Sequence, residues 1–338
     1  MVFSEDDFGN GLISAVLFDE KGLGREIGWS GIRRWTPEEG RLWVHLDFRE
    51  RGAIDWITKN VANKEAAATL LAHETRPRAF ASDEHLLVCL RGVNLNPGSD
   101  PEDMVSVRMW LGPDMAITTR HRRIMAVNDV RESFAAGNGP SDIGDFLVSI
   151  ADRLMYRMGP TLEQLEGTVD ALESRIIDGE DGPQERGSRA RDVRRELGRI
   201  RRQTIELRRH LSPQRDTMHV LMMESMPWLS EAHKSRLREV SDLVTRHVED
   251  LDALRDRGMI VQDELRNNLS DTMNNTIYVL TIMSAILLPL GFVTGLLGVN
   301  IDGIPAASNS PDAFWLLTGG LAAVAALQYF LFKRLRWL

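Results

Sequence analysis

The distribution of apolar and charged positions divides the chain near residue 276. Residues 1–276 mix the two kinds throughout, whereas the stretches 277–297 and 314–332 contain no charged residue. As helices rising about 1.5 Å per residue, both stretches are long enough to cross a hydrocarbon core about 30 Å thick. A pair of buried helices in a soluble core would not explain two such stretches back to back in a charge-rich chain. The pattern therefore predicts two C-terminal transmembrane helices.

Basic residues flank these two spans on one side only. The tail 333–338 and the residues before the first span carry lysine or arginine, whereas the connecting loop 298–313 carries neither. The positive-inside rule then places both termini in the cytoplasm and the loop outside. The basic tail is also expected to contact anionic lipid headgroups. Because the N-terminus lacks the basic and apolar regions of a signal peptide, we expect residues 1–276 to fold in the cytoplasm.

The first part of the chain, 1–140, alternates strand-like and helix-like segments. Two segments, 53–59 and 65–73, have helical patterns. Five others are β-branched or alternating and are bounded by Gly, Pro or Asp, as strands are. These predicted strands are 13–18, 42–48, 85–93, 104–111 and 115–119. The segment order predicts a mixed α/β domain.

Residues 141–276 are helical in pattern almost throughout, with helices expected at 141–158, 162–177 and 185–210. The run 230–275 has no proline and continues into the first span. One helix of about 65 residues would be on the order of 100 Å long. A single globular core does not cover such a length, so we expect the helix to pack against copies of itself. The expected fold class is α+β, with this stalk helix continuing into the first of the two spans.

The predicted helix 185–210 is rich in arginine, which suggests either nucleic-acid binding or a solvated, ion-paired face. A net charge of −8 argues against nucleic acid as a partner. We therefore favour a face that is solvated or ion-paired with acidic residues of the preceding helix. These are Glu163, Glu166, Asp170 and Glu173.

Enzyme chemistry is not indicated by any motif in the chain. The one cysteine, Cys89, allows no intramolecular disulfide and no CxxC site. The eight histidines all precede residue 248, and none are spaced as metal ligands. No GxGxxG, GxxxxGK[ST] or HExxH motif is present. We expect neither an enzyme nor a cofactor.

Two helices cannot enclose a water-filled path by themselves. If the protein conducts a solute, several copies must surround an axis, and closed cyclic symmetry is the natural arrangement.

The first span contains a proline and is directly followed by Gly298, Val299 and Asn300. This resembles the Gly-Met-Asn signature that ends the pore helix of the CorA metal-ion transporter family. Valine in place of methionine, followed by Gly-Ile-Pro at 303–305, resembles the ZntB branch of that family. Further segments are similar to that branch: Thr-Arg-Pro-Arg at 75–78, the arginines of 119–123, Pro-Gln-Arg-Asp at 213–216, Pro-Trp at 227–228 and Trp-Leu at 337–338.

The resemblance implies a homopentamer with a cytoplasmic α/β funnel domain and a central pore lined by the first span. It also implies zinc transport across the bacterial inner membrane, with proton-coupled uptake as the suggested form. The transported ion would be Zn²⁺, and the partners would be copies of the chain, lipids and divalent cations.

One face of the first span is small, mildly polar or aliphatic, and uncharged. Its predicted pore-lining residues are Asn274, Ile277, Thr281, Ser284, Leu288, Gly291 and Gly295. Such a wall has no carboxylate to strip a cation of water, so it would pass a largely hydrated ion. A ring of Asn300 amide oxygens, with Gly298 and Val299, is the predicted selectivity filter. Zinc prefers thiolate and imidazole, which the spans lack, so zinc selectivity rests on the family likeness.

Below the span, the same helical phase meets mostly acidic residues. This predicted acidic stripe comprises Asp242, Glu249, Asp252, Asp256, Asp263 and Asp271. Copies around an axis would bring these carboxylates together and concentrate divalent cations. A solvated helix surface is the alternative explanation.

Two other functions remain open from the sequence. A magnesium or cobalt channel of the same family would share every feature above. A membrane-anchored scaffold or signalling protein with a coiled-coil stalk would not need the Gly-Val-Asn pore end.

Overall fold

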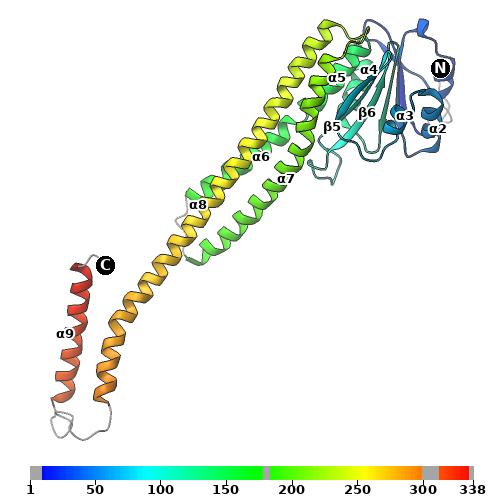
Figure 1. The fold of residues 1–338 in the computed structure, drawn as a ribbon. Coiled ribbons are helices and arrows are strands. Elements are labelled where there is room, and N and C mark those ends of the chain that lie inside the picture. The colour runs from blue at the N-terminus through cyan, green and yellow to red at the C-terminus, as the bar shows by residue number, and fades with distance from the viewer. Residues whose placement is uncertain (1–9, 178–182, 299–311, 335–338) are drawn as a thin grey trace. The chain divides into compact units, whose positions relative to one another are not determined.

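The computed structural model describes residues 10–177, 183–298 and 312–334 (Figure 1). The chain forms two compact units, Met1–Gln262 and Asp263–Leu338. The first holds a β-sheet with helices on both faces and a set of long helices. The second holds the end of the longest helix and one further helix.

The first unit is built on a seven-stranded sheet with the order β2-β1-β3-β7-β6-β5-β4. Neighbouring strands are antiparallel except for β3 and β7, which are parallel. The strands are β1 (Leu12–Phe18), β2 (Gly24–Glu26), β3 (Arg41–Asp47), β4 (Arg78–Ser82), β5 (His85–Gly92), β6 (Val105–Leu111) and β7 (Met115–Arg120). All five predicted strands are confirmed. The short strands β2 and β4 were not predicted, because each has little apolar sequence to mark it.

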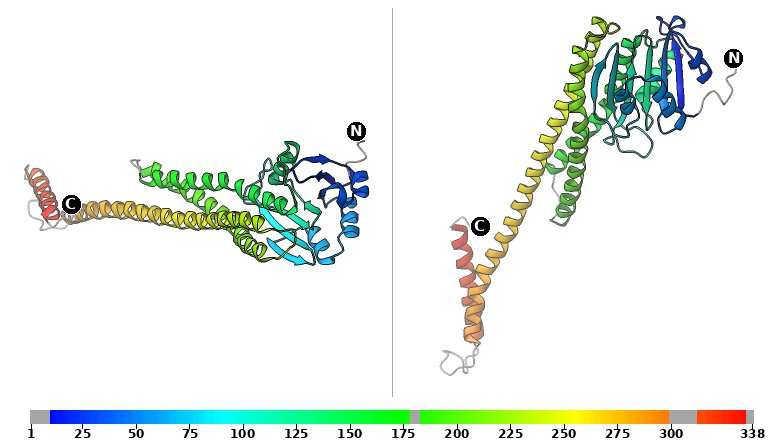
Figure 2. Two further views of the ribbon diagram at one scale, coloured as in Figure 1. Left: turned by 90° about the horizontal axis from the view of Figure 1, so that it is seen from above. Right: turned by 45° about the vertical axis from the view of Figure 1, so that its right-hand side comes forward.

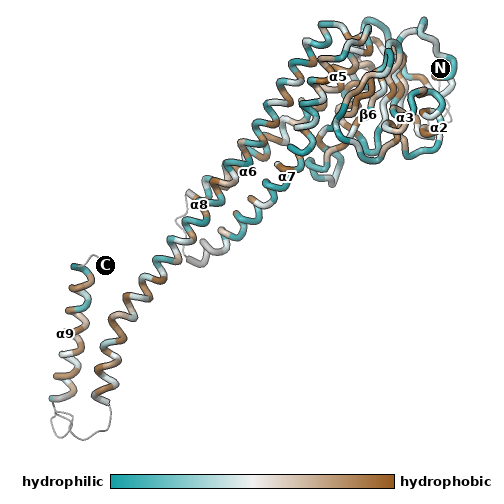
Figure 3. Tube along the Cα trace, viewed as in Figure 1, coloured by the Kyte–Doolittle hydropathy of each residue, from teal (hydrophilic) through white to brown (hydrophobic). Residues whose placement is uncertain are grey.

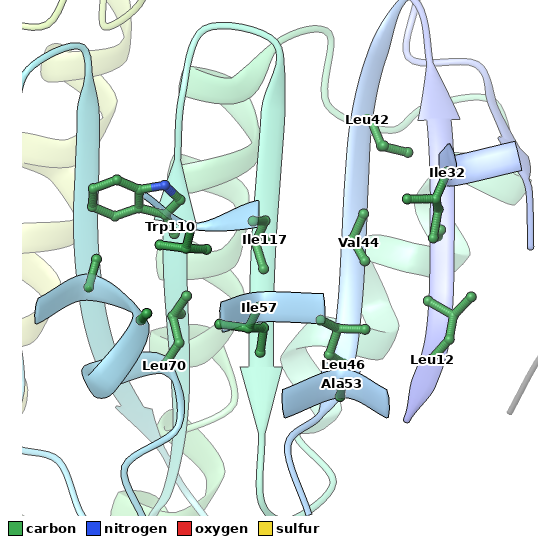
Figure 4. Close-up of a cluster of buried hydrophobic side chains, with 14 of the residues drawn as sticks. Leu12, Ile32, Leu42, Val44, Leu46, Ala53, Ile57, Leu70, Trp110 and Ile117 are labelled. Atoms are coloured by element: carbon green, nitrogen blue, oxygen red, sulfur yellow. The ribbon is translucent and has the colours of Figure 1, made fainter. Parts of the chain in front are cut away.

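Helices cover both faces of the sheet. Figure 4 shows α2 (Arg51–Asn60) over one face, where Ala53 and Ile57 meet the aliphatic residues of the strands. α3 (Lys64–Leu70) covers the same face, and Asn63 caps its N-terminus by accepting a hydrogen bond from the Ala66 amide. Each large side chain buried in such a core contributes about 1.5–3 kcal/mol to folding.

The opposite face carries α4 (Met125–Ala135) and α5 (Ile143–Tyr156). Phe134 of α4 packs on Phe18, with ring centroids 4.8 Å apart. Phe146 of α5 packs on Trp43 at 5.0 Å. A short helix α1 (Trp29–Arg34) and a 3-10 turn at Pro37–Glu39 connect β2 to β3.

Three long helices follow: α6 (Gly159–Ile177), α7 (Pro183–Met223) and α8 (Glu231–Leu297). Within the first unit α6, α7 and α8 run alongside one another (Figure 2). α7 continues through Pro213, so the prediction that this helix ends at residue 210 is wrong. Side chains on both sides of the proline, including Leu211 and Met218, are fully buried. This packing outweighs the local cost of a proline in a helix.

α8 buries a stripe of apolar residues inside its own chain. Its members recur three or four positions apart, with one step of seven after Leu254: Leu237, Val240, Val244, Val248, Leu251, Leu254, Val261 and Leu265. The expectation that the whole stalk needs copies of itself for cover is therefore wrong for the part up to Val261, because neighbouring helices of the first unit cover it. Beyond Leu265, no described side chain of α8 is buried.

Asp170 and Glu173 of α6 pair with α8, so of the two predicted states of the arginine-rich face of α7, solvated or ion-paired, the structure favours the solvated one. Arg257 of α8 bonds Asp170 at 2.5 Å and Glu173 at 2.7 Å. Several arginines of α7 instead pair within their own helix, as Arg199 does with Glu196. Because α7 presents its described arginines mostly to solvent, its basic face is a solvated surface.

The second unit contains the C-terminal part of α8 and α9 (Ala313–Arg334). Both helices are long and apolar enough to cross a membrane, and their apolar windows are not buried. Figure 3 shows hydrophobic residues along α9 and the end of α8. These are the two helices that the sequence predicts as spans.

Candidate ion pathway

The predicted pore-lining residues lie on successive turns of α8. From Asn274 to Gly295 they advance three or four positions at a time, which keeps them on one side of a helix. All seven are exposed in the single chain. Their face is thus available for other contacts.

Within residues 277–297 of α8, the half-buried residues lie on the other side of the helix. They are Ile282, Ala285, Ile286 and Leu290. A matching half-buried stripe runs along α9 at Leu317, Leu321, Ala325, Gln328 and Phe332. The described residues of the second unit form these two helices, which lie side by side, so each stripe faces the other helix (Figures 1 and 2). α9 therefore packs on the side of α8 away from the predicted pore face.

The small residues of α9 do not take part in that packing. Gly319, Gly320, Ala322 and Ala323 are exposed, although such residues permit close helix contact. They remain candidates for contact with another copy of the chain.

The wall of the predicted pore face is formed by small side chains and backbone. Thr281 donates its hydroxyl proton to the Ile277 carbonyl at 2.8 Å, which leaves its oxygen lone pairs available on this face. Gly291 and Gly295 have open space where a side chain would begin. Pro289 lies within α8 and lacks the N–H that would bond the Ala285 carbonyl.

The predicted selectivity filter begins at the end of α8. The amide of Gly298 donates to the carbonyls of Thr294 at 3.0 Å and Gly295 at 3.2 Å, which closes the last turn. Val299 and Asn300 lie outside the described residues, so the amide ring stays a prediction from the sequence.

Most residues of the predicted acidic stripe are exposed and face away from the buried side of α8. Asp242, Glu249, Asp256 and Asp263 recur every seventh residue, opposite the apolar stripe. Asp271 is exposed as well. Copies of this face could meet around an axis without disturbing the packing of the chain.

Some of these carboxylates form ion pairs with arginines. Asp252 bonds Arg208 of α7 at 2.7 Å and is less exposed than the others. Asp256 and Asp263 contact arginines of their own helix at 2.9 Å and 3.3 Å. Such exposed pairs are worth about 0–1 kcal/mol, so a cation could compete for these carboxylates.

Arg257 fixes the rotation of α8 about its axis, a role that sequence reasoning missed. The hydrogen bonds that Arg257 donates to Glu173 and Asp170 raise its pKa above the ordinary arginine value. His247 lies ten residues earlier on the same helix and contacts the Met155 carbonyl at 3.3 Å. The partners of Arg257 lie more than eighty residues away in the sequence. The only sequence feature that could have predicted this contact is the spacing of three acidic residues along one face of α6.

Among the residues that the structure describes, no three His, Cys, Asp or Glu side chains gather where they could hold a metal ion. The polar groups on the predicted pore face are hydroxyls, an amide and backbone carbonyls. These oxygens can replace water molecules around a hydrated cation without removing its inner shell.

The sheet domain, the long helix and two apolar C-terminal helices define an integral membrane protein whose soluble part precedes its spans. The model of the family described as "CorA-like Mg2+ transporter protein" matches residues 38–334. The chain belongs to this family of transporters.

Individual relatives cover nearly the whole chain. The divalent cation transporter CmaX of Pseudomonas aeruginosa is 36% identical over 332 residues, 97% of each chain. The zinc transport protein ZntB of Pectobacterium atrosepticum is 33% identical over 330 residues, also 97% of each chain. The solved structure of full-length CmaX has a TM-score of 0.82 and 34% identity, covering 98% of this chain and 100% of that one.

Proposed function

We propose that this protein transports Zn²⁺ across the bacterial inner membrane through a homopentameric pore lined by α8. The observation that carries the proposal is the uncharged face from Asn274 to Gly295, which α9 leaves uncovered and which leads to Gly-Val-Asn at 298–300. Its similarity to a zinc transport protein over 97% of the chain supports zinc as the ion.

The proposed pathway moves a hydrated ion. Outer-shell water would be exchanged for Asn300 amide oxygens at one end and for hydroxyl and carbonyl oxygens along the wall. Because the wall carries no charge, no site holds the ion tightly enough to stop its release. Leu288 and Ile277 would narrow the path with apolar side chains, which can close a pore by excluding water.

The acidic stripe would serve the cytoplasmic end of this path. Carboxylates at Asp256, Asp263 and Asp271 would raise the local cation concentration around the axis. Their proton occupancy would fall as pH rises, so the same stripe could link transport to a proton gradient. The proposed topology has both termini in the cytoplasm, with the basic tail against anionic lipid.

A magnesium or cobalt channel is the second candidate. The family model is described as a Mg²⁺ transporter. A wall of neutral oxygens also suits Mg²⁺, which gives up its water reluctantly and is often bound with several waters retained. The two candidates differ in the ion carried and share the pathway.

The amide ring is tested by Asn300→Ala, with Asn275→Ala as the matched control. Asn275 is exposed on α8 but lies off the predicted pore face. We expect Asn300→Ala to abolish metal uptake into proteoliposomes while the oligomer stays intact by size-exclusion chromatography, and Asn275→Ala to retain uptake. Metal uptake at the wild-type rate by Asn300→Ala would show that the selectivity filter is not at Asn300.

A further inference from the structure

A cavity of about 720 Å³ lies in the first unit, at one end of the sheet. Its walls come from the segment after α3, from β5, β6 and the end of β7, and from α7. On this face the sheet is apolar under α2 and α3 and becomes basic toward the cavity. Cys89 pairs with Arg108 across β5 and β6, whereas Leu87 pairs with Trp110 on the same side of the sheet.

Three distant segments singled out in the sequence meet around this cavity. Thr75 and Arg76 belong to the Thr-Arg-Pro-Arg segment, Arg122 to the arginines of 119–123, and Pro213 to the Pro-Gln-Arg-Asp segment. Gln214 of the last segment holds α7 against the sheet, because its amide pairs with both backbone groups of Arg91 at 2.7 and 3.1 Å. The ion pathway accounts for none of these segments.

Arg108 is buried in the cavity wall without a counter-charge. The residue is 1% exposed, and its Nη2 donates to the His73 carbonyl at 3.0 Å. Its Nε and Nη1 have no hydrogen-bond partner among the described residues. The guanidinium lies 4.8 Å from the centre of the Phe48 ring. Burying a charge in this way is costly unless an opposite charge comes close.

The other charges around the cavity do not neutralise it. The Arg91 guanidinium donates its hydrogen bonds to the carbonyls of Thr75 and Met104. Asp103 pairs with Arg122. Five arginines and two carboxylates line the cavity, which leaves three positive charges with the histidines neutral. The five arginines are Arg76, Arg91, Arg108, Arg122 and Arg209, and the carboxylates are Glu74 and Asp103.

The protonation of nearby groups reflects burial and, at His210, also the neighbouring positive charges. Burial lowers the pKa of Arg108 to about 10. Burial, followed by the charges of Arg91 and Arg209, lowers the pKa of His210 to about 4. An anion in the cavity would relieve both effects.

We propose that this cavity binds a phosphate-bearing anion of nucleotide size. Guanidinium groups match the geometry and charge of phosphate oxygens. The volume falls within the range of about 300–1,000 Å³ found for small-molecule sites. Because Arg209 and His210 come from α7 and the other basic residues from the sheet side, the bound anion fastens α7 to the sheet.

The test uses the full-length protein in detergent, without divalent metal and at constant ionic strength. Inorganic phosphate and ATP are titrated separately by calorimetry, and the thermal unfolding midpoint is followed with each. The variants are Arg108→Met, which removes the buried charge, and Arg209→Gln, which removes a guanidinium that is mostly exposed. Arg194→Gln, an exposed arginine elsewhere on α7, is the matched control.

We expect ATP to bind and to raise the unfolding midpoint, and each cavity variant to weaken binding about tenfold or more, as loss of a charged hydrogen bond does. Binding of inorganic phosphate with equal strength would show that the phosphate group alone is recognised, whereas tighter ATP binding would show that the nucleoside also contributes. Arg209→Gln keeps the test open if Arg108→Met fails to fold. The proposal is overturned if neither anion binds, or if both cavity variants bind as Arg194→Gln does.

Discussion

A neutral histidine inside the sheet domain is the residue with the clearest pH signature. His45 is 2% exposed, and its Nδ1 lies 2.7 Å from the Thr118 hydroxyl. That hydroxyl also accepts a hydrogen bond from Trp43 at 2.8 Å. Burial lowers the pKa of His45 to about 3.

This depressed pKa predicts a loss of stability in acid. Between the ordinary histidine value near 6.5 and about 3, the unfolded chain binds a proton that the folded chain does not. Stability is therefore complete above the higher value and falls as pH drops below it. The expected loss from His45 is about 2 kcal/mol at a pH of roughly 5.

His45→Gln removes this titration, so its unfolding midpoint should fall less between neutral pH and mild acid than that of the wild type. Other histidines with a lowered pKa, such as His210, titrate in both proteins and cancel in the comparison. The exposed His219→Gln is the control and should behave as the wild type. Equal acid sensitivity in the wild type and His45→Gln would refute this role.

Residues whose role follows from helical periodicity within one helix could be predicted from the sequence. Residues whose role depends on contacts with distant segments could not. The pore face could be proposed because its members recur on a single helix, and it stays a prediction. Arg108 and Arg257 each look like one more surface arginine in the sequence. Their surroundings come from segments tens of residues away, and no local pattern records that.

At the scale of elements, the periodicity of apolar residues identified both spans and all strands except β2 and β4. It failed where packing outweighed a local signal, as at Pro213, where buried residues carry α7 past a proline. The sequence pattern also overstated the need of α8 to pack against copies of itself. α6 and α7 bury part of α8, and only the fold reveals this packing. β4 was missed because it is recognisable mainly through its pairing with β5.

The acidic stripe of α8 makes a prediction that separates a cation funnel from a solvated helix face. Neutralising Asp256, Asp263 and Asp271 together to asparagine should lower metal flux and weaken its dependence on ionic strength. The reason is that screening acts on the charge that the variant lacks.

The control removes the same charge from exposed positions on α6 and α7. Glu163→Gln, Asp192→Asn and Asp216→Asn together should leave flux and its salt dependence unchanged. If the stripe variant matches the wild type in both respects, the stripe is only a solvated surface.

For the whole molecule, topology follows from the placement of basic residues and can be tested with one new cysteine. Ser308 lies in the loop between the spans. Ser308→Cys should react with a membrane-impermeant maleimide added outside intact spheroplasts. The native Cys89 gives little background, because it is 1% exposed and burial raises the pKa of its thiol. Labelling only after lysis would reverse the proposed orientation.

The chain matches its transporter family over residues 38–334. Zinc is the ion that we propose it carries. The fold and the two spans are common to the family and do not distinguish one divalent ion from another. Only transport by the purified protein can do so.

The most direct measurement is uptake of zinc, magnesium and cobalt into proteoliposomes containing the purified wild-type protein, with and without a pH gradient. The account predicts protein-dependent zinc uptake that exceeds uptake of the other two ions and increases when a proton gradient is imposed. Magnesium or cobalt uptake without zinc uptake would contradict the choice of ion, and no uptake of any of the three would contradict the proposed pathway itself.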